Sequence, residues 1–137
     1  MKALILAAGR GSRMEGLTDD RPKCLVELDR ETLLSRQIRT LRNGGATEIA
    51  IVTGYRREML VDHADREFHN PRWDETNMVS SLATAAEWLQ RAPCIISYSD
   101  IFYGADAIRQ LTESNVPLAI TFDPNWQDLW GRRFGDP

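Results

Sequence analysis

Ala3-Leu-Ile-Leu-Ala-Ala8 is a continuous apolar run, and Gly9 follows it directly. A short run of this kind, closed by glycine, is typical of a strand that is covered on both faces. Such strands occur in parallel sheets, because the crossover helices of a parallel sheet pack on its two faces. The run therefore predicts a central strand of a parallel sheet.

Strand-like and helix-like segments alternate along the rest of the chain. Short apolar runs predict further strands over residues 49–53, 94–98 and 117–122. Helical spacing or composition, with glycine or proline beyond the last turn, predicts helices over residues 31–43, 56–68, 79–91 and 105–114. This alternation predicts an α/β fold with three layers, α/β/α, and a mainly parallel, Rossmann-like sheet. Ligands of such folds bind at the carboxyl ends of the strands.

The composition is that of one folded domain. The 137 residues suffice for one hydrophobic core, and 42% hydrophobic and 27% charged residues are near the averages of globular proteins. Lys and Arg number 17 against 20 Asp and Glu, and the resulting net charge of −3 argues against general nucleic-acid binding. We therefore expect a single domain over residues 1–137 that binds a small molecule.

Cys24 and Cys94 lie far apart in the sequence and within apolar stretches. Two such cysteines are typical of buried, reduced thiols and not of a disulfide framework. The apolar run 3–8 is too short for a signal peptide or a membrane span. We expect a cytoplasmic protein that does not bind a membrane.

A glycine-rich loop, Gly9-Arg10-Gly11-Ser12-Arg13, comes directly after the first predicted strand. Two glycines let a backbone curl around an anion and present its N–H groups to phosphates, and Arg13 adds a positive charge. Met14 stands where a dinucleotide fingerprint has its third glycine, and no Gly-Lys-Ser/Thr of a P-loop follows. On its own the loop fits phosphate binding and an ordinary strand-to-loop turn equally well.

Lys23 follows the loop and would place an ammonium over the same phosphates, although alone it also fits a surface lysine. Residues 6–14 (LAAGRGSRM), 17–18 (LT) and 21–28 (RPKCLVEL) together closely resemble the signature of the sugar-phosphate nucleotidyltransferase family. Enzymes of that family join a nucleoside monophosphate to a phosphorylated small molecule and release pyrophosphate. The resemblance implies a nucleotide-binding domain of the nucleotidyltransferase type.

The resemblance also assigns roles to individual residues. It implies that the loop wraps the nucleoside triphosphate, through a nucleotide-binding group made of Leu6, Ala7, Ala8, Gly9, Gly11 and Ser12. Arg13 and Lys23 would contact the phosphates during transfer. Asp100, just past the predicted strand 94–98, resembles the family's metal-binding aspartate and would hold Mg²⁺, the alternative being a cap of the next turn or helix. We identify no counterpart of the family's second metal-binding aspartate in this sequence.

The segment 76–82 (TNMVSSL) opens the predicted helix 79–91 and is similar to a segment of the choline-phosphate cytidylyltransferase branch of that family. By this resemblance Asn77 and Ser81 read the nucleobase, which favours CTP. The alternative is that these side chains only cap the helix.

Residues 123–133 (DPNWQDLWGRR) also look like that branch, in which a tryptophan and an arginine follow the corresponding strand. Aromatic faces attract ammonium groups, and an arginine grips a phosphate or phosphonate. Trp126, Trp130 and Arg133 would therefore bind a phosphocholine or aminoalkylphosphonate acceptor. The alternative is that both tryptophans pack in the core or against another domain.

The resemblance leads to the hypothesis that the chain transfers CMP from CTP to a phosphorylated or phosphonate small molecule. Two alternatives stay open: a sugar-1-phosphate nucleotidyltransferase that uses UTP, GTP or dTTP, and a non-catalytic nucleotide-binding module. Later elements of the family are not recognised, so we expect a domain that lacks its C-terminal, acceptor-binding part, with an exposed edge that invites homodimer formation. Tyr55, at a strand end, is a minor site candidate, and Trp73 is interpreted as a packing residue.

Overall fold

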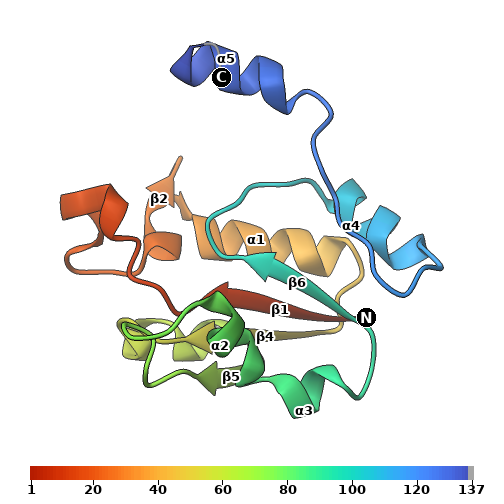
Figure 1. Cartoon of the computed structure of the whole chain (residues 1–137), viewed down its shortest axis with the longest axis horizontal. Coiled ribbons are helices and arrows are strands. Elements are labelled where there is room, and N and C mark those ends of the chain that lie inside the picture. Colours follow the sequence, from red (N-terminus) through yellow and green to blue (C-terminus); the bar gives the residue numbers. More distant parts are fainter. Residues whose placement is uncertain (136–137) are drawn as a thin grey trace.

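A four-stranded, all-parallel sheet forms the centre of the computed structural model, which describes residues 1–135. The order across the sheet is β5-β4-β1-β6 (Figure 1). Its strands are β1 (Lys2–Ala7), β4 (Glu48–Thr53), β5 (Arg66–His69) and β6 (Cys94–Tyr98). The two-residue strands β2 (Glu27–Leu28) and β3 (Glu31–Thr32) form a separate antiparallel hairpin. The predicted central parallel strand is confirmed, because β1 pairs with β4 on one side and with β6 on the other.

Five α-helices and four short 3-10 segments are described within residues 1–135. The α-helices are α1 (Leu33–Asn43), α2 (Met78–Ala83), α3 (Ala86–Leu89), α4 (Ala105–Glu113) and α5 (Trp126–Phe134). The 3-10 segments are η1 (Ser12–Thr18), η2 (Lys23–Leu25), η3 (Arg57–Met59) and η4 (Val61–His63).

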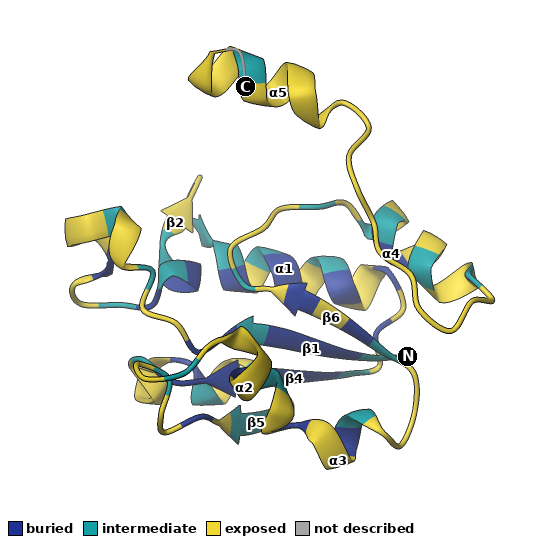
Figure 2. Ribbon diagram, viewed as in Figure 1, coloured by how far each residue is buried: buried dark blue, intermediate teal, exposed yellow. Residues whose placement is uncertain are grey.

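The sheet separates two apolar cores because successive side chains of its strands point to opposite faces. Ile5 of β1 packs in one cluster with Leu34 and Leu41 of α1 and with α4. Leu4 packs in the other cluster, together with Trp88 of α3. Figure 2 shows buried residues along the sheet and the sheet-facing sides of these helices. The predicted three-layer α/β/α fold is confirmed.

Helix α1 begins and ends where local chemistry dictates. Thr32 caps it, since its Oγ1 accepts a hydrogen bond from the Ser35 N–H at 3.1 Å. Glu31, predicted in the first turn, lies instead in β3. At the other end, a Cβ on Gly44 would lie 2.4 Å from the Cβ of Ile108, so glycine allows α4 to pack closely on α1.

The segment 56–68, predicted as one polar helix, contains η3, η4 and the start of β5 instead. Arg56 has a left-handed φ of 50°, which a right-handed helix does not accommodate. Phe68 of β5 packs on Trp88, with ring centroids 5.7 Å apart. The prediction was wrong because pairing with β4 and this contact outweigh local helical composition.

The single helix predicted over 79–91 is divided into α2 and α3. Ala85, with φ −101° and ψ 9°, leaves the helical conformation between them. The Thr84 hydroxyl donates to the Ser81 carbonyl at 2.7 Å. This side-chain hydrogen bond competes with the backbone hydrogen bonds of a continuous helix. The break lets Ala85 and Trp88 both bury against the sheet.

The segment 117–122, predicted as a strand, pairs with no strand among residues 1–135. Leu118, Ile120 and Phe122 are 87%, 84% and 77% exposed. The segment leads instead to α5, which was not predicted and which stands away from the sheet in Figure 1. The strand prediction was wrong because a strand needs a neighbouring backbone that accepts and donates its hydrogen bonds.

Both cysteines are free thiols, as predicted, but only Cys24 is buried, and Cys94 is half-buried. Burial raises the pKa of the Cys24 thiol to about 12 and that of Cys94 to about 11. Among the helices of residues 1–135, none has the length and apolarity that a membrane crossing requires.

Candidate active site

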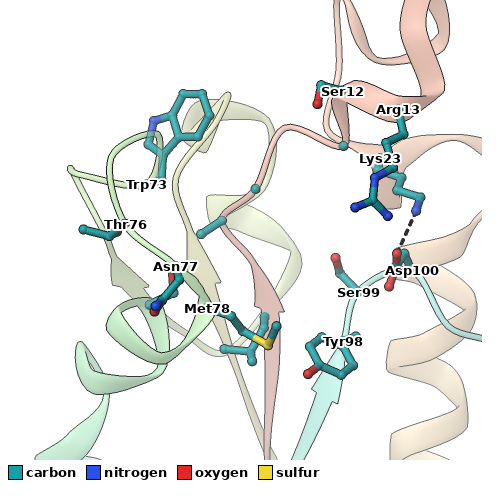
Figure 3. Close-up of a pocket in the computed structure, with 15 residues that line it drawn as sticks. Ser12, Arg13, Lys23, Trp73, Thr76, Asn77, Met78, Tyr98, Ser99 and Asp100 are labelled. Atoms are coloured by element: carbon teal, nitrogen blue, oxygen red, sulfur yellow. Dashed lines mark hydrogen bonds and ion pairs between the residues drawn. The ribbon is translucent and has the colours of Figure 1, made fainter.

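A pocket of about 360 Å³ opens at the carboxyl ends of β1 and β6. Figure 3 shows its two walls: Ser12, Arg13, Lys23 and Asp100 on one side, and Trp73, Thr76 and Asn77 on the other. The first wall comes from the start of η1, from η2 and from the turn after β6. The second comes from the segment before α2. The pocket therefore lies where a parallel α/β sheet binds its ligands.

Gly11 lets the glycine-rich loop turn back on itself. Its φ of 71° is left-handed, and a Cβ there would lie 2.9 Å from the Cβ of Lys23. The Gly11 carbonyl accepts a hydrogen bond from the Met14 N–H at 3.0 Å, and the buried Thr18 hydroxyl lies 3.2 Å from the same oxygen. The loop is thus held by its own contacts.

Tyr55 fastens this loop to the end of β4. Its N–H donates to the Ala8 carbonyl at 2.9 Å, and its hydroxyl lies 2.9 Å from the Thr18 carbonyl and 3.0 Å from that of Asp19. Tyr55 also packs on Trp73, with ring centroids 5.4 Å apart. Tyr55, the minor site candidate, therefore stabilises the position of the loop by hydrogen bonds to its backbone.

Lys23 and Asp100 form an ion pair at the mouth of the pocket, with Lys23 Nζ 2.7 Å from Asp100 Oδ2. Lys23 begins η2, directly after the buried Pro22, which is the N-cap residue of this turn. Asp100 follows β6, where the Ser99 N–H donates to the Leu6 carbonyl at 3.2 Å. The two side chains are 34% and 39% exposed, so the pair is in contact with solvent and stabilises the fold little.

Asn77 and Ser81 both make structural hydrogen bonds at α2. Asn77 caps the helix, because its Oδ1 accepts from the Ser80 N–H at 3.1 Å. The buried Ser81 hydroxyl accepts from Asn70 Nδ2 at 3.0 Å. Capping therefore occurs, and both residues also line the pocket. Among residues 1–135 the Asn77 side-chain nitrogen has no hydrogen-bond partner.

A sequence model of the family described as MobA-like NTP transferase domain matches residues 3–127. The chain belongs to this family. Its membership confirms the resemblance to nucleotidyltransferases that the segments 6–14, 17–18 and 21–28 carry.

Named relatives of this NTP transferase domain include nucleotidyltransferases that differ in base specificity. A CTP:phosphoglutamine cytidylyltransferase of Campylobacter jejuni is 37% identical over all of this chain and 58% of its own length. A UTP–glucose-1-phosphate uridylyltransferase of Haloferax volcanii is 40% identical over 93% of this chain and 56% of its own.

A solved structure, the CTP:phosphocholine cytidylyltransferase from Streptococcus pneumoniae, matches with a TM-score of 0.65 and 31% identity, over 77% of this chain and 49% of that one. The chain therefore spans about half the length of the relatives it matches.

Most of the predicted site residues meet in the pocket of this NTP transferase domain. Those that line it are Leu6, Ala8, Gly9, Gly11, Ser12, Arg13, Lys23, Asn77, Ser81 and Asp100. Ala7 is buried at the end of β1 and lies behind the lining. The predicted acceptor residues Trp126, Trp130 and Arg133 lie on α5 and are not brought to the pocket.

Five lining residues were not predicted: Trp73, Thr76, Met78, Tyr98 and Ser99. Tyr98 and Ser99 come at the carboxyl end of β6, a position that the sheet topology makes a site candidate. Trp73, interpreted as a packing residue, both packs on Tyr55 and lines the pocket. No local sequence signal gives this placement, which depends on Gly54, where a Cβ would lie 2.5 Å from the Cβ of Trp73.

Asp100 is the carboxylate that the pocket presents to a ligand. Within residues 1–135, no three or more His, Cys, Asp or Glu side chains come together in a group suited to a metal ion.

Proposed function

We propose that this pocket binds CTP and that the chain transfers CMP to a phosphorylated or phosphonate small molecule, releasing pyrophosphate. The observation that carries the proposal is the meeting of the glycine-rich loop, Arg13, Lys23 and Asp100 at one pocket. Membership of the NTP transferase family supports the reaction type. The names of the Campylobacter and Streptococcus relatives support CTP as the nucleotide.

The loop offers the triphosphate a close approach to the backbone. Gly9 lines the pocket, and a Cβ added there would meet no atom within 4 Å, so the backbone is open to a ligand at this residue. Arg13 and Lys23 then supply positive charge near the phosphates. Phosphoryl-type transfer depends on positioning and on stabilising charge, so an acceptor oxygen attacks the α-phosphorus in line without a covalent protein nucleophile.

Asp100 fits a magnesium ion that is shared with the nucleotide. Mg²⁺ in nucleotide sites is typically held by one or two carboxylates together with substrate phosphates and water, and the pocket presents one carboxylate on the same wall as Arg13 and Lys23. When bound, the ion would neutralise charge on the phosphate oxygens. Lys23, which balances Asp100 at 2.7 Å, would then turn its ammonium to the phosphates.

Asn77 is the residue that we propose to read the base. Its Oδ1 is used in capping, while its nitrogen, without a partner among residues 1–135, is a donor at the pocket. Cytosine presents acceptors at O2 and N3, whereas uracil carries a hydrogen on N3. A donor aimed at N3 therefore favours CTP over UTP. Ser81, bound to Asn70, would support this wall.

The acceptor assignment to Trp126, Trp130 and Arg133 rests on the sequence pattern alone, since α5 lies apart from the pocket. We propose phosphocholine or an aminoalkylphosphonate as the acceptor class. The alternative function is uridylyl transfer to a sugar 1-phosphate, which the similarity to the Haloferax uridylyltransferase favours.

Pyrophosphate release by the chain tests these functions directly. Each nucleoside triphosphate would be combined with Mg²⁺ and with phosphocholine, 2-aminoethylphosphonate or glucose 1-phosphate. Release with CTP and an aminoalkyl acceptor is expected. Release only with UTP and glucose 1-phosphate would replace the proposal by its alternative, and tight CTP binding without release would favour a non-catalytic module.

Gly9→Ala and Gly131→Ala are a matched pair for the same assay. Neither position has an atom within 4 Å of an added Cβ, but Gly9 lines the pocket and Gly131 lies on α5. We expect Gly9→Ala to fold normally and to weaken CTP binding at least about tenfold, the equivalent of one lost phosphate hydrogen bond. Gly131→Ala should bind CTP as the unmodified chain does. Equal binding by both variants would contradict close approach at Gly9.

A further inference from the structure

Gln37, a buried polar residue of α1, reaches the turn that carries Asp100. Gln37 is 4% exposed. Its Nε2 lies 2.6 Å from the Tyr98 carbonyl and 3.4 Å from the Ile101 carbonyl. It also lies 3.1 Å from Ser97 Oγ. One amide group therefore contacts backbone on both sides of Asp100.

A second group supports the same turn. The Tyr103 hydroxyl donates to Ser97 Oγ at 2.8 Å, and Ser97 Oγ in turn donates to the Tyr98 carbonyl at 3.0 Å. The Tyr98 carbonyl thus receives hydrogen bonds from two buried or half-buried side chains. Beyond it, Ile101 and Phe102 are 44% and 69% exposed, so apolar packing holds this stretch weakly.

The Gln37 carbonyl oxygen Oε1 is buried without a partner among residues 1–135. Leaving a buried acceptor unpaired is unfavourable, and an apolar side chain of similar length avoids this penalty. The Oε1 atom therefore adds no stability, and the contribution of Gln37 comes from the hydrogen bonds that its Nε2 donates. Its N–H groups, which grip the turn, are the part that the structure uses.

We propose that Gln37 is a positioning residue for Asp100. By holding the carbonyls of Tyr98 and Ile101, it fixes the turn so that the Asp100 carboxylate faces Lys23 and the glycine-rich loop. Groups that orient a metal ligand commonly change metal affinity about 10- to 100-fold when they are removed. This inference rests on the proposed function, in which Asp100 shares a divalent ion with CTP.

The test compares Gln37→Met with Gln110→Met in the full chain. Gln110 is an exposed residue of α4 with no side-chain hydrogen bond among the described residues, so the same chemical change there touches nothing in the pocket. Mn²⁺ binding in the presence of CTP would be followed by electron paramagnetic resonance. We expect Gln37→Met to weaken Mn²⁺ binding about 10- to 100-fold and Gln110→Met to leave it unchanged. CTP affinity without metal should stay within about twofold in both, because the loop after β1 is intact.

Amide hydrogen exchange supplies a readout that does not depend on the ligand. Gln37→Met should accelerate exchange at Ser99 to Ile101, while β1 and β4 keep their protection. Equal Mn²⁺ affinity of Gln37→Met and the unmodified chain would overturn the proposal. If the unmodified chain binds no Mn²⁺ with CTP, the proposed function fails, and exchange then decides the positioning role: faster exchange supports it and unchanged exchange overturns it.

Tyr103→Phe covers the case in which Gln37→Met does not fold. It removes one hydroxyl that reaches Ser97 and leaves the Gln37 amide in place. A smaller loss of Mn²⁺ affinity in the same direction is expected. Because the Gln37 amide stays in place, a loss as large as the 10- to 100-fold loss expected for Gln37→Met would overturn the assignment of the positioning role to Gln37.

Discussion

Two apolar runs of similar composition, 3–8 and 117–122, end in opposite environments in this molecule. The first supplies β1, in which Leu4 and Ile5 are fully buried. The second contains Leu118 and Ile120, which are 87% and 84% exposed. Figure 2 shows the same contrast between the buried sheet and the exposed C-terminal segment with α5.

The difference shows what an apolar run does and does not predict. β1 has strand partners on both edges and helices over both faces, so its backbone is paired on both sides and most of its side chains are buried. The segment 117–122 has no strand partner among residues 1–135. Hydrophobicity marks residues that gain by burial, whereas the neighbouring backbone decides whether they form a strand.

The largest expected effect is the difference in the free energy of unfolding between Ile5→Ala and Ile120→Ala. Truncating the buried Ile5 should lower the free energy of unfolding by about 2–5 kcal/mol, because it removes apolar contacts and leaves a cavity. Truncating the exposed Ile120 should change it by less than about 0.5 kcal/mol. Urea denaturation followed by circular dichroism measures both. Losses of similar size would show that 117–122 is buried in solution and would break the contrast.

An effect of intermediate size on the free energy of unfolding is expected from a pair of glycine substitutions, Gly11→Ala and Gly131→Ala. Gly11→Ala forces a left-handed residue to carry a Cβ that lies 2.9 Å from the Lys23 side chain, and should cost about 1–2 kcal/mol in the free energy of unfolding. Gly131→Ala, in α5, adds a Cβ that meets nothing and should leave global unfolding within about 0.5 kcal/mol. Equal effects on the unfolding midpoint would contradict the difference between the two regions.

The smallest expected effect concerns acid stability and Asp65, which ties β4 to α1. Its carboxylate accepts from the Ile49 N–H at 2.7 Å and also pairs with Arg42. The hydrogen bond from Ile49, followed by that from Arg42, lowers the pKa of Asp65 below its usual 3.8. A carboxyl group with a lowered pKa in the folded state stabilises the fold above pH 3.8, and this contribution is lost as the pH falls through the folded value.

Asp65→Asn should therefore lower the free energy of unfolding at pH 7 by about 1 kcal/mol or less, since the side chain is partly exposed. The difference from the unmodified chain should shrink below pH 3.8. Asp128→Asn, an exposed change on α5, is the matched control and should follow the unmodified chain. Urea titrations at a series of pH values measure both. A difference that persists at low pH would contradict this role of Asp65.

The sequence predicts elements best where local pattern and tertiary pairing agree. The apolar run 3–8 is confirmed as a strand because it is central, and α1 is confirmed because Thr32 caps its start and Gly44 and Gly45 end it. The segment 56–68 was mispredicted, since a left-handed Arg56 and pairing with β4 are not visible in composition. The run 117–122 was mispredicted for want of a partner strand.

In the candidate site too, the residues with a local sequence signal were predicted, and those placed by tertiary contacts were not. Lys23 and Asp100 were expected near the glycine-rich loop, and the carboxyl ends of parallel strands bring them within 2.7 Å of each other. Trp73 was missed as a lining residue because its position depends on contacts with Gly54 and Tyr55 from another part of the chain. Gln37 was missed because a helical glutamine carries no sign of the turn that it meets in the fold.

The central claim is that Lys23, beside Asp100, contacts the phosphates of a nucleotide in this pocket. The most direct test is isothermal titration calorimetry of CTP binding in the presence of Mg²⁺. It compares the unmodified chain with Lys23→Met and Arg91→Met. Arg91 is an exposed cation at the opposite end of β6, outside the pocket. Lys23→Met should weaken CTP binding at least about tenfold, because hydrogen bonds to charged groups contribute about 1.5–3 kcal/mol, and Arg91→Met should bind as the unmodified chain does. Equal CTP affinity in all three proteins would contradict the claim.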